Sequence, residues 1–157
     1  WDFIDLDKYI EQKTGRRIPD IFETDGEAAF REIESQTLRE FGSCEGTVIA
    51  LGGGAVISSL NLDYIKAVGI LIYLKLPADV IYNRIKRKTT RPLFNDLIIN
   101  NRPESEFIAR ITSLLEKRKE YYEKADIIVE LENYPINVSV DLVLEKIMRY
   151  CNEKNYC

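Results

Sequence analysis

The sequence predicts an α/β fold of three layers, α/β/α, in which helices cover both faces of a mostly parallel β-sheet. Short apolar runs typical of buried strands occur at residues 47–51 and 69–74, and another strand is expected at 126–130. Segments with helical apolar periodicity lie between these runs. The chain of 157 residues has no internal repeat and no linker, so we expect a single domain over residues 1–157.

The other elements have local signals of their own. Gly15 and Gly42 are expected to close the first and third helices, because glycine readily adopts the left-handed conformation that ends a helix. Residues 24–27 form a predicted capping region for the third helix. The remaining expected elements are a strand at 2–6 and helices at 7–13, 19–23, 61–66, 76–87, 103–124 and 137–153. In the last helix, the side chains expected to face the core are those of Val140, Val143, Leu144, Ile147 and Cys151.

Residues 88–103 contain two prolines and several asparagines and are predicted to form a loop. A loop of this length without structure of its own is uncommon unless it is functional. We therefore predict a lid over a binding site, with a plain surface loop as the alternative.

Composition excludes several classes of function. The net charge of −4 gives no sign of broad nucleic-acid binding, and no apolar run approaches the length of a membrane span, so neither partner is expected. The chain has no histidine, which excludes Ser–His and Cys–His catalysis and leaves acid–base work to carboxylates, Lys or Tyr. The three scattered cysteines are typical of reduced thiols, so a cytoplasmic location is expected.

The apolar run at 48–51 ends in Gly52, Gly53 and Gly54. In open α/β sheets, ligands bind outside the carboxyl ends of the strands, where glycine lets the backbone approach them closely. The run therefore predicts a small-molecule site, although a flexible turn would show the same glycines.

Asp5 and Asp7 lie two residues apart at the end of a predicted strand, where they would point to the same side. Two such carboxylates could hold Mg²⁺ through water and accept a proton from a hydroxyl. The alternative is that Asp7 only caps the helix that follows.

Arg31 and Arg118 lie on or beside apolar helix stripes. A guanidinium in such a place needs an anionic partner, which could be the carboxylate of a substrate held bidentately. For Arg118, a protein carboxylate such as Glu34, or a buried stem with its charged head in water, would be the structural alternative.

A further group of cations clusters at a predicted helix end and in the following loop. Its members are Arg84, Arg87, Lys88 and Arg91. Positive charges on such a segment suit a phosphate chain whose charge develops in a transition state. Cations also favour helix carboxyl ends without any ligand.

Together these residues resemble those of shikimate kinase over nearly the whole chain. The motifs that carry the resemblance are 3–7 with 10–11, 21–22 with 25–27 and 30–34, 51–55, 90–93, and 117–118 followed by Tyr121. The resemblance implies transfer of the γ-phosphate of ATP to the 3-hydroxyl of shikimate, with Mg²⁺, on the route to chorismate and aromatic amino acids. It also implies a small-molecule enzyme, which we expect to be a monomer.

The resemblance implies a role for each site residue. Arg31 and Arg118 would hold the shikimate carboxylate, while Asp7 would bind the ring hydroxyls and draw the proton from the attacking one. Asp5 would position Mg²⁺ through water. The backbone at Gly52, Gly53 and Gly54 would contact the substrate, Arg91 would close over the phosphates, and Arg84 and Asn133 would lie near the adenine.

The sequence departs from the family in one respect, because no G-x-x-x-x-G-K-[ST] motif occurs in it. In the family that loop follows a central strand, which we expect to precede Trp1. Without them, these residues alone are expected to show poor stability and negligible kinase activity. Two alternatives stay open: another small-molecule kinase such as gluconate kinase, and a non-catalytic module that binds shikimate.

Overall fold

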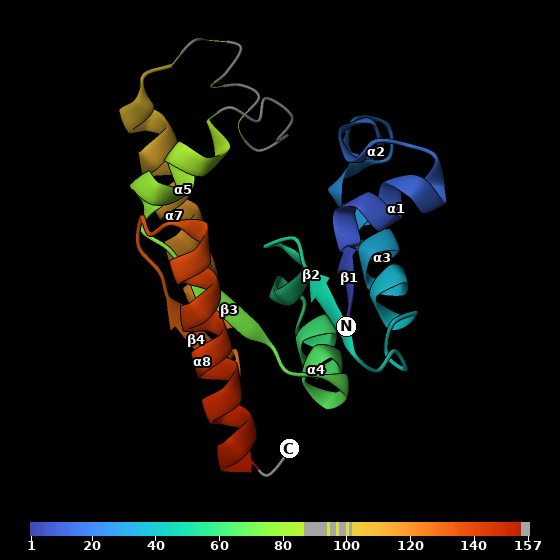
Figure 1. Cartoon of the computed structure of the whole chain (residues 1–157). Coiled ribbons are helices and arrows are strands. Elements are labelled where there is room, and N and C mark those ends of the chain that lie inside the picture. The colour runs from blue at the N-terminus through green and yellow to red at the C-terminus, as the bar shows by residue number, and fades with distance from the viewer. Residues whose placement is uncertain (87–93, 95–96, 98–99, 101, 155–157) are drawn as a thin grey trace. The chain divides into compact units, whose positions relative to one another are not determined.

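The computed structural model describes residues 1–86, 94, 97, 100 and 102–154, which form two compact units, Trp1–Gly69 and Ile70–Cys157 (Figure 1). Each unit combines helices with a pair of parallel strands, which confirms the predicted α/β class. None of the helices in the described part of the chain has the length and apolarity that a membrane span requires. Most of the predicted lid lies outside the described residues, and the single domain stays a prediction.

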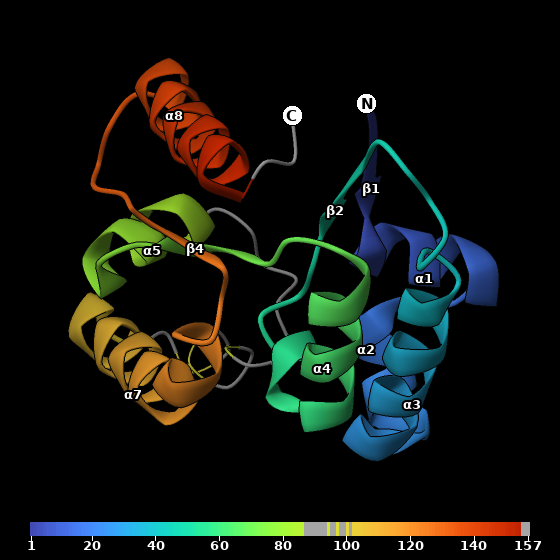
Figure 2. The ribbon, with the colours of Figure 1, turned by 90° about the horizontal axis from the view of Figure 1, so that it is seen from below.

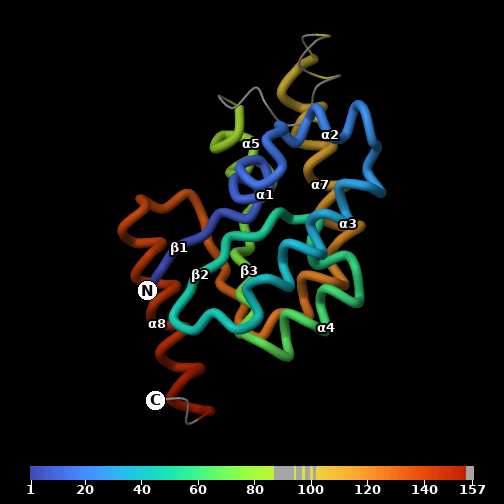
Figure 3. Tube along the Cα trace, turned by 90° about the vertical axis from the view of Figure 1, so that its right-hand side faces the viewer, coloured from blue at the N-terminus to red at the C-terminus, as the bar shows by residue number. Residues whose placement is uncertain are grey.

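The first unit places its parallel strands side by side and covers them with helices (Figure 3). Its elements are β1 (Asp2–Asp5), α1 (Leu6–Thr14), α2 (Ile18–Thr24), α3 (Gly26–Arg39), β2 (Thr47–Ala50), the short 3₁₀ helix η1 (Ala55–Ile57) and α4 (Ser59–Val68). Strand β1 pairs with β2 in a register that sets Asp5 opposite Ala50. Helix α3 contacts α1, α2 and α4, and the side chains of Leu6, Ile10 and Phe30 are buried there.

Local polar contacts fix where these helices begin. The Asp5 carboxylate accepts a hydrogen bond from the backbone N–H of Lys8 at 3.2 Å and so caps α1. Glu11 of α1 accepts one from the N–H of Ile18 at 2.9 Å, which satisfies an amino-terminal donor of α2. The start of α2 is therefore tied to α1 by a side chain seven residues earlier in the chain.

The predicted cap of α3 is wrong. Asp25 stands at the N-cap, but its side chain makes no capping hydrogen bond. It instead accepts a hydrogen bond from Arg16 Nη1 at 2.6 Å and one from the Thr24 hydroxyl at 2.8 Å. The Asp25 carboxylate therefore pairs with Arg16 in the preceding loop and does not cap α3.

Gly42 does not end α3 as predicted, because the helix ends at Arg39 and Gly42 is not among the glycines with positive φ. The Tyr64 hydroxyl donates instead to the Arg39 carbonyl at 3.0 Å. A Cβ added at Gly42 would lie 2.9 Å from Cζ of Tyr64, so glycine is needed there for the close approach of that ring.

The second unit is itself layered, with α7 and α8 on opposite sides of its strands (Figure 2). Its elements are β3 (Ile72–Lys75), α5 (Ala78–Ile85), α7 (Glu104–Tyr122), β4 (Ile127–Glu130) and α8 (Ile136–Lys154). Ile127 and Val129 of β4 are buried against α8. On the other face, the ring of Tyr73 lies 4.9 Å from that of Tyr122 on α7.

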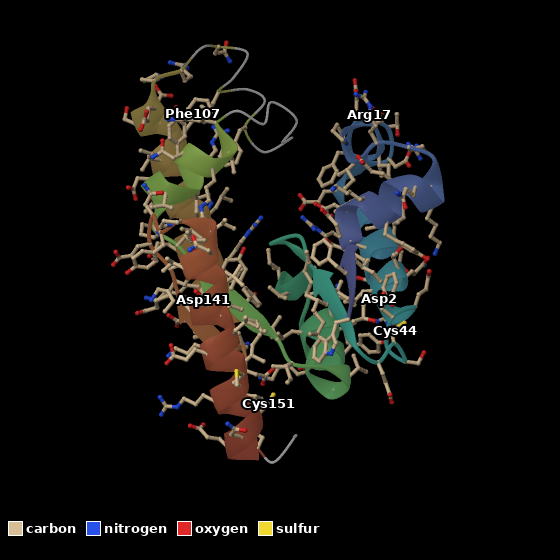
Figure 4. All side chains as sticks on the ribbon, in the orientation of Figure 1. Asp2, Arg17, Cys44, Phe107, Asp141 and Cys151 are labelled. Atoms are coloured by element: carbon tan, nitrogen blue, oxygen red, sulfur yellow. The ribbon has the colours of Figure 1, made fainter. Side chains whose placement is uncertain are left out.

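A second apolar cluster joins α5 to α7. Phe94, Leu97 and Ile111 are its buried residues. Phe107, labelled on α7 in Figure 4, lies with its ring centroid 5.7 Å from that of Tyr82 on α5. This cluster holds the two helices together along α5, from which Ala78, Ile81, Tyr82 and Ile85 pack against it.

Two expectations about burial are wrong, and so is one about where a strand begins. The strands predicted as buried are partly exposed, with Val48 and Leu74 both 47% exposed, because the parallel sheet of each unit contains two strands in the described residues. Strand β3 also begins later than predicted, since Gly69 serves as the C-cap of α4. On α8, Val140 and Leu144 face outward because the stripe that meets β4 runs through Leu142, Val143, Ile147 and Tyr150.

Gly15 has a φ of 66° at the end of α1, where a side chain is strained. Replacing Gly15 with Ala should lower the free energy of unfolding by about 1 kcal/mol. Urea denaturation followed by circular dichroism would measure it. Gly69→Ala is the matched control, because Gly69 has extended backbone and a Cβ there meets only ordinary contact at 3.8 Å. Equal losses in the two variants would contradict the conformational explanation.

Candidate active site

The paired carboxyl ends of β1 and β2 bring Asp7 to the glycine run. The parallel register sets the two strand ends opposite each other, so the start of α1 lies beside the chain that leaves β2. A Cβ added at Gly52 would lie 3.2 Å from Oδ1 of Asp7 and 3.4 Å from Oε1 of Glu34. Glycine at this position therefore leaves the space in which two carboxylates approach the backbone.

The strand spacing that suggested a common side for Asp5 and Asp7 does not apply. Strand β1 ends at Asp5, and Asp7 lies in the first turn of α1. The capping carboxylate is that of Asp5, so Asp7 does not have the structural role considered as its alternative. Asp7 is exposed and is held close to Gly52 by the turn from strand to helix.

Arg31 of α3 is surrounded by two carboxylates of its own helix. Its Nη1 donates to Oε2 of Glu34 at 2.8 Å, while Nε and Nη2 donate to Oε1 of Glu27 at 3.3 and 3.1 Å. The guanidinium carbon lies 5.2 Å from the centroid of the Phe30 ring. Glu34 and Glu27 lie three and four residues from Arg31, so these two carboxylates share its face of the helix.

Gly54 lies against the guanidinium of Arg31. A Cβ added at Gly54 would be 2.6 Å from Cζ and 2.5 Å from Nη2, so the guanidinium would have to move away. Arg31 and the glycine run, which are far apart in sequence, thus form one site with Asp7 in the first unit. The run is held by η1, since the Ala55 N–H donates to the Gly52 carbonyl at 3.0 Å.

Glu34 is the site residue that sequence reasoning missed. Only 1% of it is exposed, although it carries a carboxylate. Its position four residues after Phe30, on the apolar stripe of α3, was the available signal, because a charge on such a stripe is rarely buried without a partner. The structure pairs it with Arg31, whose Nη1 lies 2.8 Å from Oε2 of Glu34.

Opposing effects act on the pKa of Arg31. Burial favours the neutral form and lowers the pKa, but the hydrogen bonds and charges of Glu34 and then Glu27 outweigh it, so the net direction is upward. Arg31 therefore stays charged, and its charge is shared between the carboxylates of Glu34 and Glu27.

The remaining predicted residues belong to the second unit. Arg118 is half-buried on α7, and its Nη1 donates to the hydroxyl of Tyr122 at 3.5 Å. Arg84 is exposed in the last turn of α5, and Asn133 is exposed between β4 and α8. Arg91 lies outside the described residues, as do Arg87 and Lys88 of the same predicted cation cluster.

The site offers few oxygen ligands to a metal. Across residues 1–86 and the other described positions, no group of three or more acidic or cysteine side chains is placed to hold an ion. Asp5 supplies one half-exposed carboxylate beside the site. A single carboxylate is compatible with Mg²⁺, which keeps several of its waters when it binds proteins with nucleotide phosphates.

Comparison with known proteins shows the family to which the chain belongs. The family described as shikimate kinase matches residues 1–152. The shikimate kinase of Chlorobaculum parvum is 37% identical over 150 residues, which cover 96% of this chain and 80% of that protein. The shikimate kinase of Thermodesulfovibrio yellowstonii is 36% identical over 154 residues, covering 98% of this chain and 84% of the relative.

Solved structures give the same result. Shikimate kinase from Bacteroides thetaiotaomicron matches with a TM-score of 0.81 and 32% identity over 94% of this chain and 84% of that one. Shikimate kinase from Acinetobacter baumannii in complex with shikimate matches with a TM-score of 0.81 and 32% identity over 94% and 79%.

The fold is that of an α/β kinase of the P-loop class. Within that class, the chain belongs to the shikimate kinase family. The family uses ATP to phosphorylate shikimate in aromatic amino acid biosynthesis. This match decides in favour of an enzyme over the non-catalytic module, and in favour of shikimate kinase over gluconate kinase.

Replacing Glu34 with Gln should destabilise the protein by about 1–3 kcal/mol, because a half-buried guanidinium loses its charged partner. Glu32→Gln is the control, since Glu32 is exposed on the same helix and accepts a hydrogen bond from Gln36 at 2.8 Å. Chemical denaturation would compare them. A loss no larger in Glu34→Gln than in Glu32→Gln would show that the buried pair contributes nothing.

Proposed function

We propose that the site formed by Asp7, Arg31 and the glycine run binds shikimate and directs transfer of the γ-phosphate of ATP to its 3-hydroxyl. The observation that carries this proposal is the convergence of a carboxylate and a guanidinium on Gly52 and Gly54. A ring acid with hydroxyl groups needs both kinds of side chain. Phosphoryl transfer requires positioning and charge compensation more than covalent chemistry, so a site without histidine suffices.

Arg31 and Arg118 hold the substrate carboxylate in this proposal. Support for Arg31 comes from its fixed position: Glu34 and Gly54 orient a guanidinium that keeps its charge. A guanidinium pairs bidentately with a carboxylate, which sets both the position and the rotation of the ring. Support for Arg118 is its half-burial on the inner stripe of α7 together with the resemblance of 117–118 to the family motif.

Asp7 accepts the proton of the attacking hydroxyl. Its carboxylate lies at the start of α1 and close to Gly52, where a ring hydroxyl could hydrogen-bond to it. A positioned carboxylate of this kind orients the nucleophile and takes up its proton as the phosphoryl group is transferred. The backbone at Gly52, Gly53 and Gly54 contacts the same ring, because no side chain stands in the way.

The nucleotide side of the reaction is assigned to other residues. Arg84 and Asn133, both exposed, are proposed to lie near the adenine, and Arg91 to compensate the charge of the phosphates. Asp5 would hold Mg²⁺ through water, and the ion would supply charge neutralisation at the phosphates. The residues that cradle the β- and γ-phosphates in P-loop kinases are not assigned, since the sequence contains no such motif.

Replacing Asp7 with Asn keeps the shape of the side chain and removes the proton acceptor. Shikimate-dependent ADP release should fall about 10²- to 10⁴-fold. Shikimate binding, measured by calorimetry, should change far less. Asp2→Asn, which removes an exposed carboxylate from the start of β1, is the control and should retain activity. Turnover by Asp7→Asn at the unchanged rate would refute the assignment of Asp7.

Replacing Arg118 with Ala removes a proposed contact to the substrate carboxylate. The KM for shikimate should rise at least about tenfold, with a smaller effect on kcat, because ground-state and transition-state binding are lost together. Lys119→Ala is the control, since Lys119 is exposed on the same helix and pairs with Glu123 at 4.0 Å. Steady-state kinetics would measure KM and kcat separately for both variants. Equal KM values for wild type and Arg118→Ala would contradict the proposed role of Arg118.

A further inference from the structure

Arg31 already holds a carboxylate on the edge that a substrate carboxylate needs. Oε1 of Glu27 straddles Nε at 3.3 Å and Nη2 at 3.1 Å. These two groups form one of the guanidinium edges that can pair with both oxygens of a carboxylate. A substrate that uses this edge must therefore displace the side chain of Glu27.

The two carboxylates around Arg31 differ in how easily they can be moved. Glu34 is 1% exposed and holds Nη1, so it fixes the guanidinium from inside. The Glu27 side chain is 65% exposed and lies on the solvent side. Exposed ion pairs four residues apart on a helix contribute little to stability, so one partner can be exchanged for another anion at small cost.

The charges in the first unit's site also oppose an anionic substrate. Glu27 and Glu34 both hydrogen-bond to the guanidinium of Arg31, and a third carboxylate, that of Asp7, lies near Gly52 as Glu34 does. Glu34 cannot leave without exposing a buried charge, and Asp7 is assigned to the hydroxyl. Glu27 is thus the carboxylate whose departure would restore positive charge where a substrate carboxylate binds.

We propose that Glu27 is a displaceable internal carboxylate that determines specificity for acidic substrates. It occupies the Nε–Nη2 edge of Arg31 until the substrate carboxylate replaces it. Anions that bind weakly and cannot hydrogen-bond to both nitrogens are excluded, because their binding energy does not compensate for breaking the ion pair between Glu27 and Arg31. The inference rests on the proposed function, in which Arg31 holds the carboxylate of shikimate.

The test compares Glu27→Gln with Glu32→Gln, which removes the same charge from a position of α3 that contacts Gln36 instead of Arg31. Calorimetry would measure binding of shikimate and of its uncharged methyl ester to the wild-type protein and both variants. Glu27→Gln should bind shikimate about two- to fivefold more tightly than wild type, since the exposed pair no longer has to be broken. Binding of the methyl ester should be unchanged, and Glu32→Gln should match wild type for both ligands.

Other results would overturn the inference. Weaker or equal shikimate binding by Glu27→Gln would mean that Glu27 only positions Arg31, and an equal gain in Glu32→Gln would mean a general effect of net charge. Glu27→Ala also frees the Nε–Nη2 edge of Arg31 and should show the same increase in shikimate affinity. If one of the two variants fails to fold, the other still tests the inference. If the wild-type protein binds no shikimate, the proposed function itself fails; shikimate binding without the gain refutes the role of Glu27 alone.

Discussion

The ion pair between Arg31 and the buried carboxylate of Glu34 is the interaction on which the site depends. A carboxylate that is 1% exposed is stable only when a charged partner and hydrogen bonds compensate its lost hydration. Here the partner lies three residues earlier on α3, and the pair fixes the guanidinium against the backbone at Gly54. The side chain that could bind an anion is thus ordered by the protein before any ligand arrives, which lowers the entropy cost of binding.

Strand pairing places this ion pair beside Asp7. The parallel register of β1 and β2 ends at Asp5 and Ala50, so both chains leave the sheet at the same edge. One chain turns directly into α1 and carries Asp7, while the other becomes the glycine run. Because a Cβ at Gly52 would crowd Asp7 and Glu34, the glycine follows from the convergence of the two chains and not from a need for flexibility.

Much of the fold and part of the site could be predicted from sequence, because they depend on short-range patterns. Apolar periodicity located the helices and strands, and the glycine run marked a close approach of backbone. Glu34 could not be found this way, since its burial depends on a partner that only the folded helix face defines. The predicted cap of α3 was wrong for a related reason, because the Asp25 carboxylate has a stronger partner in Arg16. On α8 two apolar stripes overlap in sequence, and only the packing against β4 selects Val143 and Ile147 over Val140 and Leu144.

The unequal burial of the two carboxylates around Arg31 resolves a conflict between order and binding. If both were buried, the charge of the guanidinium would be fully compensated. Removing either partner would then cost about 3–5 kcal/mol, which is more than the binding of a small acid in its place could compensate. If both were exposed, each pair would contribute only about 0.2–1 kcal/mol, and the long side chain would sample many rotamers. With Glu34 inside and Glu27 outside, one carboxylate holds the arginine in place while the other can be exchanged for an acid of similar geometry. The same helix can therefore supply both the rigidity and the exchangeable charge that recognition of a carboxylate requires.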